Sequence, residues 1–310
     1  MPRPEDLHVD VALSGFALDY ALQQDFIGPL VAPTLNVQKL SDKYWVADKS
    51  HLMLHDIKRA PGDLYARVDW GYSTDNYLCE GYGVQAIVAK ETIANADPQT
   101  DPAEDAIAAV TGEIMLNAEV RVAAKAFSPS VFTQTSGLSS TARWDSTAPD
   151  PWGNRKTANA AVRPATGKKV NTLIIGDLVW EYLRDMAVIK TAIYGMGPQG
   201  VPTVDQVAAV LGIKRIIVGS GVYWDGTKMV DIWGKCALWA YYPDSVDQNR
   251  GRIIVPMRTM AWNVDGVARF QVSAPEWVQS RKAFVHYVDD YTDEKVTCAA
   301  AGYLFTTVIS

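Results

Sequence analysis

The chain has 310 residues, long enough for two modest domains or one large elaborated domain. Its composition, with 48% hydrophobic and 21% charged residues, is that of a globular protein and excludes a disordered chain. The net charge is −6, without a block of consecutive Lys or Arg, which argues against a protein that grips nucleic acid by neutralising phosphates. A chain of this kind that works beside DNA is expected to enclose it.

Cysteine usage and hydropathy bear on the compartment. The three cysteines, Cys79, Cys236 and Cys298, lie far apart and are odd in number. That arrangement argues against a disulfide framework and indicates synthesis in a reducing cytoplasm. The acidic N-terminal residues MPRPEDLHVD do not match a signal peptide, and the longest uncharged run, 296–310, is shorter than the ~18 residues of a membrane span. We expect no membrane association.

The first 75 residues predict two segments without cover of their own. Residues 1–40 are predicted to form an arm, because Pro29 and Pro33 interrupt its apolar residues and forbid a long helix. Residues 41–75 predict a long two-stranded excursion around the turn signal RAPGD. An isolated hairpin is marginally stable in water, so we expect this one to lie on another surface.

Residues 101–126 predict one long helix. Asp101 supplies the N-cap, Pro102 the first helical position, and Glu104 a carboxylate three residues after the cap. The apolar residues that recur at helical spacing are Ile107, Val110, Ile114, Ala118 and Val122. At ~1.5 Å per residue the helix is about 35 to 40 Å long and would form the spine of its domain.

The rest of the chain alternates strands and helices. Residues 128–154 are rich in Ser, Thr, Pro and Gly and predict a loop. Buried strands are predicted at 170–175, 215–218 and 237–242, and helices at 177–185 and 204–211. Asp177 and Thr203 are the predicted caps of these helices. The tail, 282–305, predicts a strand, an acidic turn and a second strand.

A strand that runs through one glycine into a helix, as at Gly176–Asp177, is where many enzymes bind a phosphate. This stretch has neither G-x-G-x-x-G nor G-x-x-x-x-G-K-[ST]. The charge of Asp177 and its predicted capping role oppose an anion at the helix N-terminus. We interpret the junction as a corner of the scaffold.

No other group of residues predicts a catalytic, cofactor-binding or metal site. His51 and His55 have the spacing of two ligands on one helix face, but they lie in the predicted hairpin without a third ligand and are better explained as surface or interface histidines. The carboxylates of 289–294 could bind a cation, but a solvated turn explains them better. A nucleophile, a base and an orienting group do not come together, so the sequence does not predict an enzyme.

In their order, these segments resemble the major capsid proteins of tailed bacteriophages. The stretches that carry the resemblance are DFIGPLVAPTLNVQKLSDKYWVADK (25–49), KRAPGDLYARVDWGYSTDNYLCEGYG (58–83), VNTLIIGDLVWEYLRD (170–185), TVDQVAAVLGIKRIIVGSGVYW (203–224), IWGKCALWAYYPD (232–244) and AAAGYLF (299–305). They span nearly the whole chain. None is diagnostic alone, and the resemblance rests on their order.

The resemblance implies an α+β fold of the Hong Kong 97-like capsid type. It divides the chain into an N-terminal arm (1–40), an extended loop over a neighbouring subunit (41–75), a peripheral domain around the spine helix (76–165 and 280–310) and an axial α/β domain (166–279). The tips of the axial domains would meet around five-fold and six-fold centres.

The function implied is that of a major capsid protein without catalytic activity or cofactor. Such a chain assembles as hexamers and pentamers into the icosahedral head shell, which encloses packaged double-stranded DNA without sequence-specific binding. It would be made and assembled in the host bacterial cytoplasm and reside in the virion. We expect a separate scaffolding protein, because no long charged helical segment precedes the arm, and a portal; a decoration protein is left open.

The hairpin tip supplies the predicted contact between subunits. Lys58 and Arg59 stand beside the Pro61–Gly62 turn and are expected to meet carboxylates of a neighbouring subunit, with Glu104 as one candidate. Two alternatives stay open. One is an encapsulin-like shell around an enzyme cargo, and the other is a small-molecule enzyme that uses the corner at Gly176.

Overall fold

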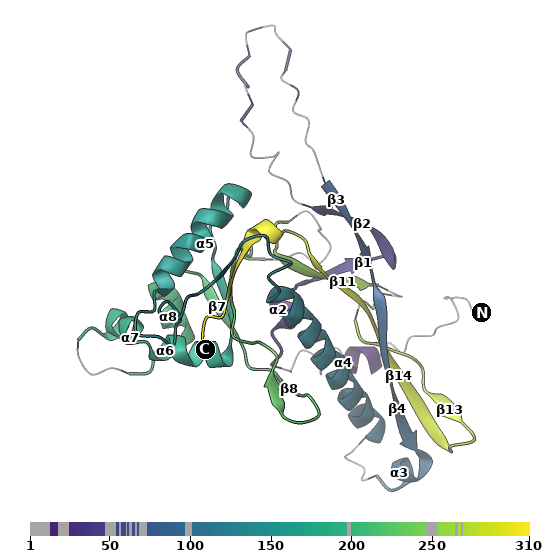
Figure 1. Cartoon of the computed structure of the whole chain (residues 1–310). Coiled ribbons are helices and arrows are strands. Elements are labelled where there is room, and N and C mark those ends of the chain that lie inside the picture. The colour runs from purple at the N-terminus through teal and green to yellow at the C-terminus, as the bar shows by residue number, and fades with distance from the viewer. Residues whose placement is uncertain are drawn as a thin grey trace.

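The computed structural model describes residues 13–17, 25–46, 54–55, 57–59, 61, 64–65, 67, 73–96, 101–196, 200–245, 253–263, 266–267 and 269–310 (Figure 1). The helices are α2 (Gly28–Val31), α3 (Lys90–Ala94), α4 (Pro102–Ala126), α5 (Pro151–Thr166), α6 (Asp177–Asp185), α7 (Ala187–Tyr194), α8 (Val204–Leu211) and the 3-10 helix η3 (Ala299–Ala301). The strands are β1 (Thr34–Val37), β2 (Ser41–Val46), β3 (Ser73–Leu78), β4 (Glu80–Ala89), β5 (Thr135–Gly137), β6 (Thr172–Gly176), β7 (Arg215–Gly219), β8 (Val222–Trp224), β9 (Met229–Asp231), β10 (Ala237–Ala240), β11 (Met257–Trp262), β12 (Gln271–Val272), β13 (Glu276–Val278), β14 (Ala283–Val296) and β15 (Gly302–Thr306).

Two sheets organise these elements. The first is six-stranded, with the order β1-β11-β14-β12, and β4 and β13 also pair with β14. The second is five-stranded, with the order β5-β15-β10-β6-β7. Figure 1 shows α4 alongside β4 and β14 on one side of the molecule, and α5 to α8 around β7 on the other. The mixed α+β architecture expected from the sequence is confirmed.

The spine helix is confirmed as α4. It runs over 25 residues from Pro102, and the side chain of Asp101 accepts a hydrogen bond from the amide of Ala103 at 2.9 Å. The residues that α4 buries are Ile107, Thr111, Ile114, Met115, Glu119, Val122, Ala123 and Ala126. The helix packs this stripe against β4 and β14, as its apolar spacing predicts.

The predicted acidic turn in the tail is wrong. Residues 283–296 form one continuous strand, β14, which pairs with β4 from Ala283↔Ala89 to Thr292↔Glu80. Alternate residues of a strand face the same side, so Asp290 and Glu294 point inward and are buried. Each meets an arginine; Asp290 accepts two hydrogen bonds from Arg269, at 2.7 and 2.8 Å. Arginines that are distant in the sequence neutralise these buried carboxylates, so the acidic stretch can form a strand.

The predicted two-stranded excursion is confirmed at its base. Strands β2 and β3 pair antiparallel from Ser41↔Leu78 to Val46↔Ser73. Gly62, half of the predicted turn, lies outside the described residues. The arm contributes a strand as well, because β1 pairs in parallel with β11 from Thr34↔Thr259. The C-terminal end of the arm therefore belongs to the six-stranded sheet.

The five-stranded sheet follows the predicted alternation closely. Helices α6 and α8 have the predicted bounds, and Thr203 caps α8 in a reciprocal pair of hydrogen bonds with Gln206. Its core side chains, packed between the sheet and the helices, include Leu173, Ile175, Val179, Leu183, Val207, Leu211 and Trp239. Helix α5 begins at Pro151, inside the predicted loop 128–154, with the side chain of Asp150 as its cap.

Strand β15 bears on the proposed division into domains. It pairs with β10 and β5, so it extends the five-stranded sheet rather than the sheet of β14. The segment 280–310, which the resemblance assigns to a peripheral domain, therefore contributes its last strand to the five-stranded sheet. Residues Val308 and Ile309, which follow β15, are buried in the core of that second sheet.

Candidate functional site

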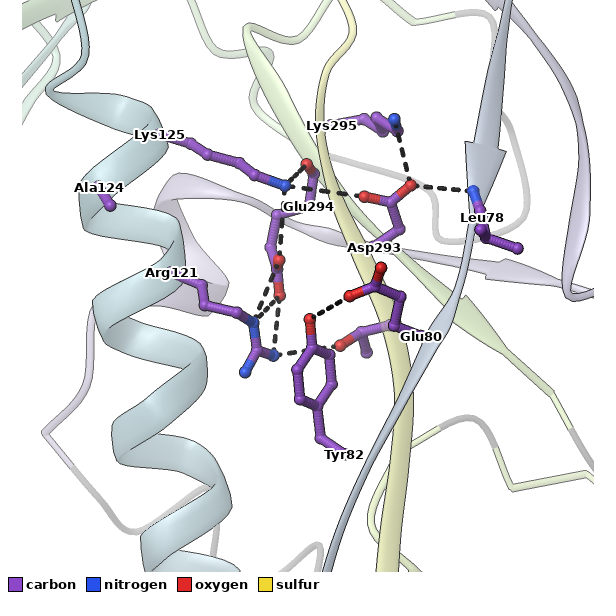
Figure 2. A pocket seen from close by; sticks show the side chains of 10 residues that line it. Leu78, Glu80, Tyr82, Arg121, Ala124, Lys125, Asp293, Glu294 and Lys295 are labelled. Atoms are coloured by element: carbon purple, nitrogen blue, oxygen red, sulfur yellow. Dashed lines mark hydrogen bonds and ion pairs between the residues drawn. The ribbon is translucent and has the colours of Figure 1, made fainter.

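A charged pocket lies where the root of the β2–β3 hairpin meets α4 and β14 (Figure 2). Its volume is about 490 Å³. It is lined by Leu78, Glu80, Tyr82, Arg121, Ala124, Lys125, Thr292, Asp293, Glu294 and Lys295. Three acidic and three basic side chains share this space, so the pocket is close to neutral. We call these ten residues the hairpin junction.

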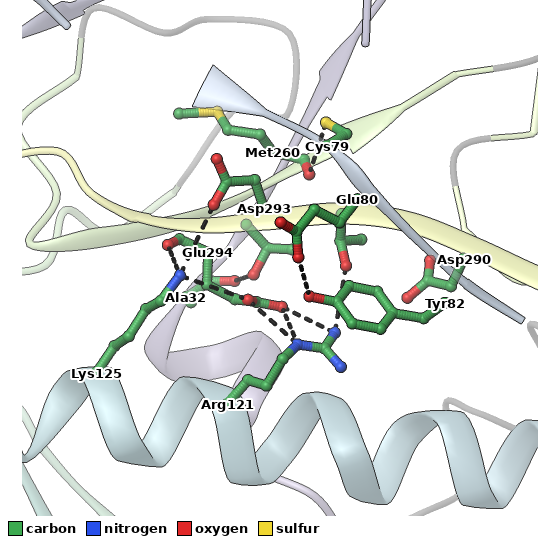
Figure 3. Close-up of polar contacts among 12 residues, drawn as sticks. Ala32, Cys79, Glu80, Tyr82, Arg121, Lys125, Met260, Asp290, Asp293 and Glu294 are labelled. Carbon is green, nitrogen blue, oxygen red and sulfur yellow. Dashed lines mark hydrogen bonds and ion pairs between the residues drawn. The ribbon is translucent and has the colours of Figure 1, made fainter. Parts of the chain in front are cut away.

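Arg121 and Glu294 form the centre of the hairpin junction. The carboxylate of Glu294 is buried and accepts hydrogen bonds from Arg121 Nη2 at 3.0 Å and Nε at 3.2 Å (Figure 3). The same guanidinium lies 3.6 Å from the ring centroid of Tyr82 and donates to the hydroxyl of Thr292 at 3.3 Å. Stacking and paired hydrogen bonds are the geometry in which an arginine compensates a buried carboxylate. This pair fixes β14 and β4 to the spine helix.

Asp293 ties the root of the hairpin to the same strand. Its Oδ2 accepts a hydrogen bond from the amide of Leu78, at the end of β3, at 3.0 Å. Two lysines flank the carboxylate, Lys295 at 3.3 Å and Lys125 at 3.7 Å (Figure 2). Lys125 also donates to the backbone carbonyl of Glu294 at 2.5 Å. The junction thus links the root of the hairpin to α4 through Asp293 of β14.

A second polar centre joins the arm, the spine and the five-stranded sheet. The buried carboxylate of Glu119, on α4, accepts hydrogen bonds from the amides of Gly28 at 2.6 Å and Ile27 at 3.1 Å, and from Trp233 Nε1 at 2.6 Å. Burial raises the pKa of Glu119, and the three hydrogen bonds oppose that rise. Glu119 was not predicted; the available signal was a carboxylate on the apolar stripe of α4, between Met115 and Val122.

The predicted contact residues lie at exposed positions. Lys58 and Arg59 are exposed in the extended loop, and the Arg59 guanidinium lies 4.3 Å from the ring centroid of Tyr65. Glu104 is exposed in the first turn of α4. The contact predicted for these three residues needs a second subunit and stays a prediction.

The corner at Gly176–Asp177 differs from its prediction in one respect. Gly176 itself occupies the N-cap position of α6, and Asp177 is the first helical residue and makes no capping hydrogen bond. A Cβ at Gly176 would collide with the backbone carbonyl of Trp233. The glycine is therefore required by a close approach of two backbones, which supports the interpretation as a corner.

The structure assembles no metal site from its described residues. Within the described ranges, no group of three or more His, Cys, Asp or Glu side chains lies close enough to hold a metal ion. His55 is exposed, and His51 lies outside the described residues. In the same part of the chain, none of the helices combines the length and apolar character that a membrane span requires.

All three cysteines are free thiols, as their number and spacing predict. Burial raises the pKa of Cys79 to about 12, and it raises the pKa of Cys236 and Cys298 as well. Cys79 lies beside the hairpin junction, where its thiol donates to the carbonyl of Met260 at 3.6 Å (Figure 3). Thiols of this kind are weak nucleophiles and serve as small apolar side chains.

Comparison with known proteins adds a relative in sequence. No family model matches the chain. The major capsid protein of Burkholderia phage BcepMu is 28% identical over 242 residues, which cover 76% of each chain.

Solved structures share the fold over almost the whole chain. A phage-related protein from Bordetella bronchiseptica RB50 superposes with a TM-score of 0.81 and 23% identity, covering 97% of this chain and 98% of its own. An encapsulin complex from Synechococcus elongatus PCC 7942 gives a TM-score of 0.56 at 11% identity, with 91% and 89% covered. The mature capsid of bacteriophage PhiM1 gives 0.51 at 9% identity, with 89% and 85% covered. The chain therefore has the Hong Kong 97-like coat fold and is a homologue of a phage major capsid protein, as the order of its segments indicates.

Proposed function

We propose that the chain is the major capsid protein of a tailed phage and assembles as hexamers and pentamers into an icosahedral shell around double-stranded DNA. The observation that carries the proposal is the combination of the coat fold along 97% of the chain with a sequence relative named as a major capsid protein. Fold alone is shared with encapsulins, but the relative in sequence is a phage protein.

The extended loop gives physical support, because it exposes apolar side chains that a monomer would not keep in water. Leu54, Ile57, Leu64 and Tyr65 are between 82% and 99% exposed. Contiguous exposed apolar residues mark surfaces that associate. The exposure of these four side chains is explained if the extended loop lies on a neighbouring subunit.

The charge of the chain fits a container for DNA. With a net charge of −6, the chain does not hold DNA by overall electrostatic attraction, which suits a shell whose DNA must enter and leave. We propose a separate scaffolding protein and a portal as further partners, assembly in the host bacterial cytoplasm, and no catalytic role for the chain. A decoration protein remains open as an additional partner.

An encapsulin-like compartment is the second candidate, because an encapsulin matches over 91% of the chain. The two candidates differ in content. A phage capsid encloses DNA, whereas an encapsulin-like shell encloses protein cargo.

Two measurements test the proposal. Purified recombinant protein should sediment far above its 34.0 kDa chain mass and show capsomers or closed shells by negative-stain electron microscopy. A monomer at all protein and salt concentrations would contradict a shell protein. Particles that contain the chain, isolated from lysed infected cells and treated with nuclease, should protect double-stranded DNA; particles filled with protein from uninfected cells would favour the encapsulin-like alternative.

A further inference from the structure

Positive charge gathers on α5 and on the turn that follows it. Residues 151–176 carry five cations and no carboxylate, although the whole chain has a net charge of −6. Figure 1 shows α5 at the upper edge of the group of helices α5 to α8. Four of the five cations are exposed, and we call them the α5 basic patch: Lys156, Arg163, Lys168 and Lys169.

The α5 basic patch follows one side of the helix. Lys156 and Arg163 are seven residues apart, close to two helical turns, so their side chains leave α5 in nearly the same direction, about 10 Å apart along its axis. Gly167 ends the helix in the left-handed conformation, with φ 72°, and the two lysines follow at once. The patch therefore continues past the end of α5. The residues that α5 buries are Pro151, Ala158, Val162 and Thr166.

The elements packed against α5 do not neutralise the patch. None of its four cations makes an ion pair within the described part of the chain. Helix α5 packs against η3, β10, β15 and α8. The first three carry no charged residue. The single carboxylate of α8, Asp205, lies in its first turn, whereas Trp152 of α5 donates to the carbonyl of Val210 at the other end of α8.

The carboxylates that flank α5 in the sequence or the sheet have partners of their own. Asp150 caps the helix by accepting a hydrogen bond from the amide of Gly153 at 2.8 Å. Asp145 accepts from the amide of Ser310 at 2.7 Å. Asp244, which follows β10, pairs with Lys214. The patch therefore keeps its excess of positive charge.

Stability of the helix explains only part of this pattern. Cations near the C-terminus of a helix interact favourably with its dipole, which accounts for Arg163 and for the two lysines after Gly167. Lys156 lies in the first half of α5 and gains nothing from that interaction. The first turn, where the dipole favours carboxylates, contains none. A ligand with negative charge along its length explains all four cations.

The surroundings of the patch suit phosphates better than a protein partner. No large hydrophobic side chain is exposed within 151–169, a stretch that is described throughout. Protein interfaces have an apolar centre rich in aromatic residues, whereas binding to the nucleic acid backbone relies on Lys and Arg. The exposed residues between the cations are small, so a phosphate backbone can approach: Thr157, Ala160, Pro164 and Gly167.

We propose that the α5 basic patch contacts the phosphate backbone of the packaged double-stranded DNA, so that this side of α5 faces the interior of the shell. The inference rests on the proposed function, since it needs an enclosed duplex, and it adds which surface of the chain meets that duplex. Contacts with phosphates carry no sequence information and let a protein slide along DNA. Four cations on a chain that is acidic overall make a weak contact of this kind.

Binding of a short DNA duplex of random sequence to the 310-residue chain, kept as unassembled capsomers, tests the proposal by fluorescence anisotropy. Three to four phosphate contacts predict that the affinity of the wild type falls roughly 40- to 150-fold between about 50 and 200 mM salt. A variant in which glutamine replaces all four cations of the patch should lose this salt-dependent binding. The matched control replaces four exposed cations elsewhere and should bind within about threefold of the wild type: Lys43→Gln, Lys90→Gln, Lys228→Gln and Arg281→Gln.

Circular dichroism of each variant should match that of the wild type, because the replaced side chains are exposed. Arginine in place of the three lysines of the patch should preserve binding. Equal losses in the patch variant and the matched control would overturn the proposal, since they would reflect net charge alone, and so would unchanged binding in the patch variant. Binding of poly-glutamic acid as tight as that of the duplex, through the same four residues, would overturn it in favour of an acidic protein partner.

Formaldehyde cross-linking of DNA-filled, nuclease-treated particles gives the second readout. Peptides that contain Lys156, Lys168 or Lys169 should carry nucleotide adducts more often than peptides that contain Lys90 or Lys228. DNA-filled particles without adducts on the patch would contradict the contact alone. Particles without DNA would contradict the proposed function, and the duplex-binding assay then still decides whether the patch binds phosphates.

Discussion

Replacing Glu119 by Ala removes one acceptor from three buried donors. The carboxylate on α4 accepts from the amides of Ile27 and Gly28 and from the indole of Trp233, between 2.6 and 3.1 Å. These donors belong to the arm and to the segment before β10, which lie 91 to 114 residues away in sequence. The substitution therefore acts on the place where three separate parts of the chain meet.

The expected loss follows from the number of donors. A buried donor left without an acceptor costs about 1–3 kcal/mol, which sums to roughly 3–9 kcal/mol for three. The removed carboxylate was itself costly to bury, and water can enter the space that it leaves, so the net loss should be about 3–5 kcal/mol. Glu119→Gln keeps the shape but turns an amide nitrogen toward the donors, and should lose about 1–3 kcal/mol.

Urea unfolding followed by circular dichroism and tryptophan fluorescence measures these losses, with all chains compared in the same assembly state. Glu113→Ala is the matched control, since Glu113 is exposed on the same helix, and it should change the free energy of unfolding by no more than about 0.5 kcal/mol. If the free energy of unfolding of Glu119→Ala lies within about 1 kcal/mol of the value for this control, the loss is no larger than that of one surface contact. Glu119 then does not hold the three segments together, and the reasoning is wrong.

Three further predictions concern charge. Burial raises the pKa of Glu119 in the folded chain, so the wild type should gain stability relative to Glu119→Gln as pH falls from that raised pKa to the ordinary pKa of a glutamate. Urea titrations of both chains at several pH values between neutral and acidic measure the difference in the free energy of unfolding. A difference that does not change with pH would contradict the prediction. Arg121→Ala should cost about 3–5 kcal/mol, since it removes the hydrogen-bonded partner of the buried Glu294 carboxylate and leaves only Lys125, 3.7 Å away, as a cation. Thermal unfolding at matched pH measures the loss, and a loss under about 1 kcal/mol would contradict a buried pair. Lys58→Glu with Arg59→Glu should leave the circular dichroism of the chain unchanged and weaken shell closure seen by electron microscopy, and more so at high salt if the surviving contacts are also ionic. Each exposed pair contributes only ~0.2–1 kcal/mol, but a shell repeats it in every subunit. Normal shells in normal yield would remove the tip from the assembly contacts.

The sequence predicts the start of a helix correctly where an N-cap residue is followed by apolar residues at helical spacing. Asp101–Pro102 gave the start of α4, and Thr203 gave the start of α8. Asp150–Pro151 is the same signal at the start of α5, but Gly153 in the first turn and the Ser, Thr, Pro and Gly before it favour the predicted loop. A cap predicts a helix reliably only when the residues after it also favour one.

Long-range compensation is what the sequence did not reveal. The acidic residues of β14 resemble a turn in the sequence because their partners, Arg121 and Arg269, lie 173 and 21 residues away along the chain. Glu119 looked like an ordinary polar residue of a helix for the same reason. Charges that are buried in pairs can be assigned only once the pairs are known, so the hairpin junction emerged from the structure.

Strand β14 and helix α4 form one rigid unit. The strand has 14 residues and the helix 25, so each extends for roughly 40 Å, and the two lie side by side. Arg121 clamps the helix to the strand near one end, and the apolar side chains of Ile114 and Val288 join them along the length. A strand and a helix that are joined in this way along their length resist bending together. The root of the hairpin at Leu78 and the arm held by Glu119 both attach near the end at which Arg121 joins the helix to the strand, so a force on either segment acts at that end.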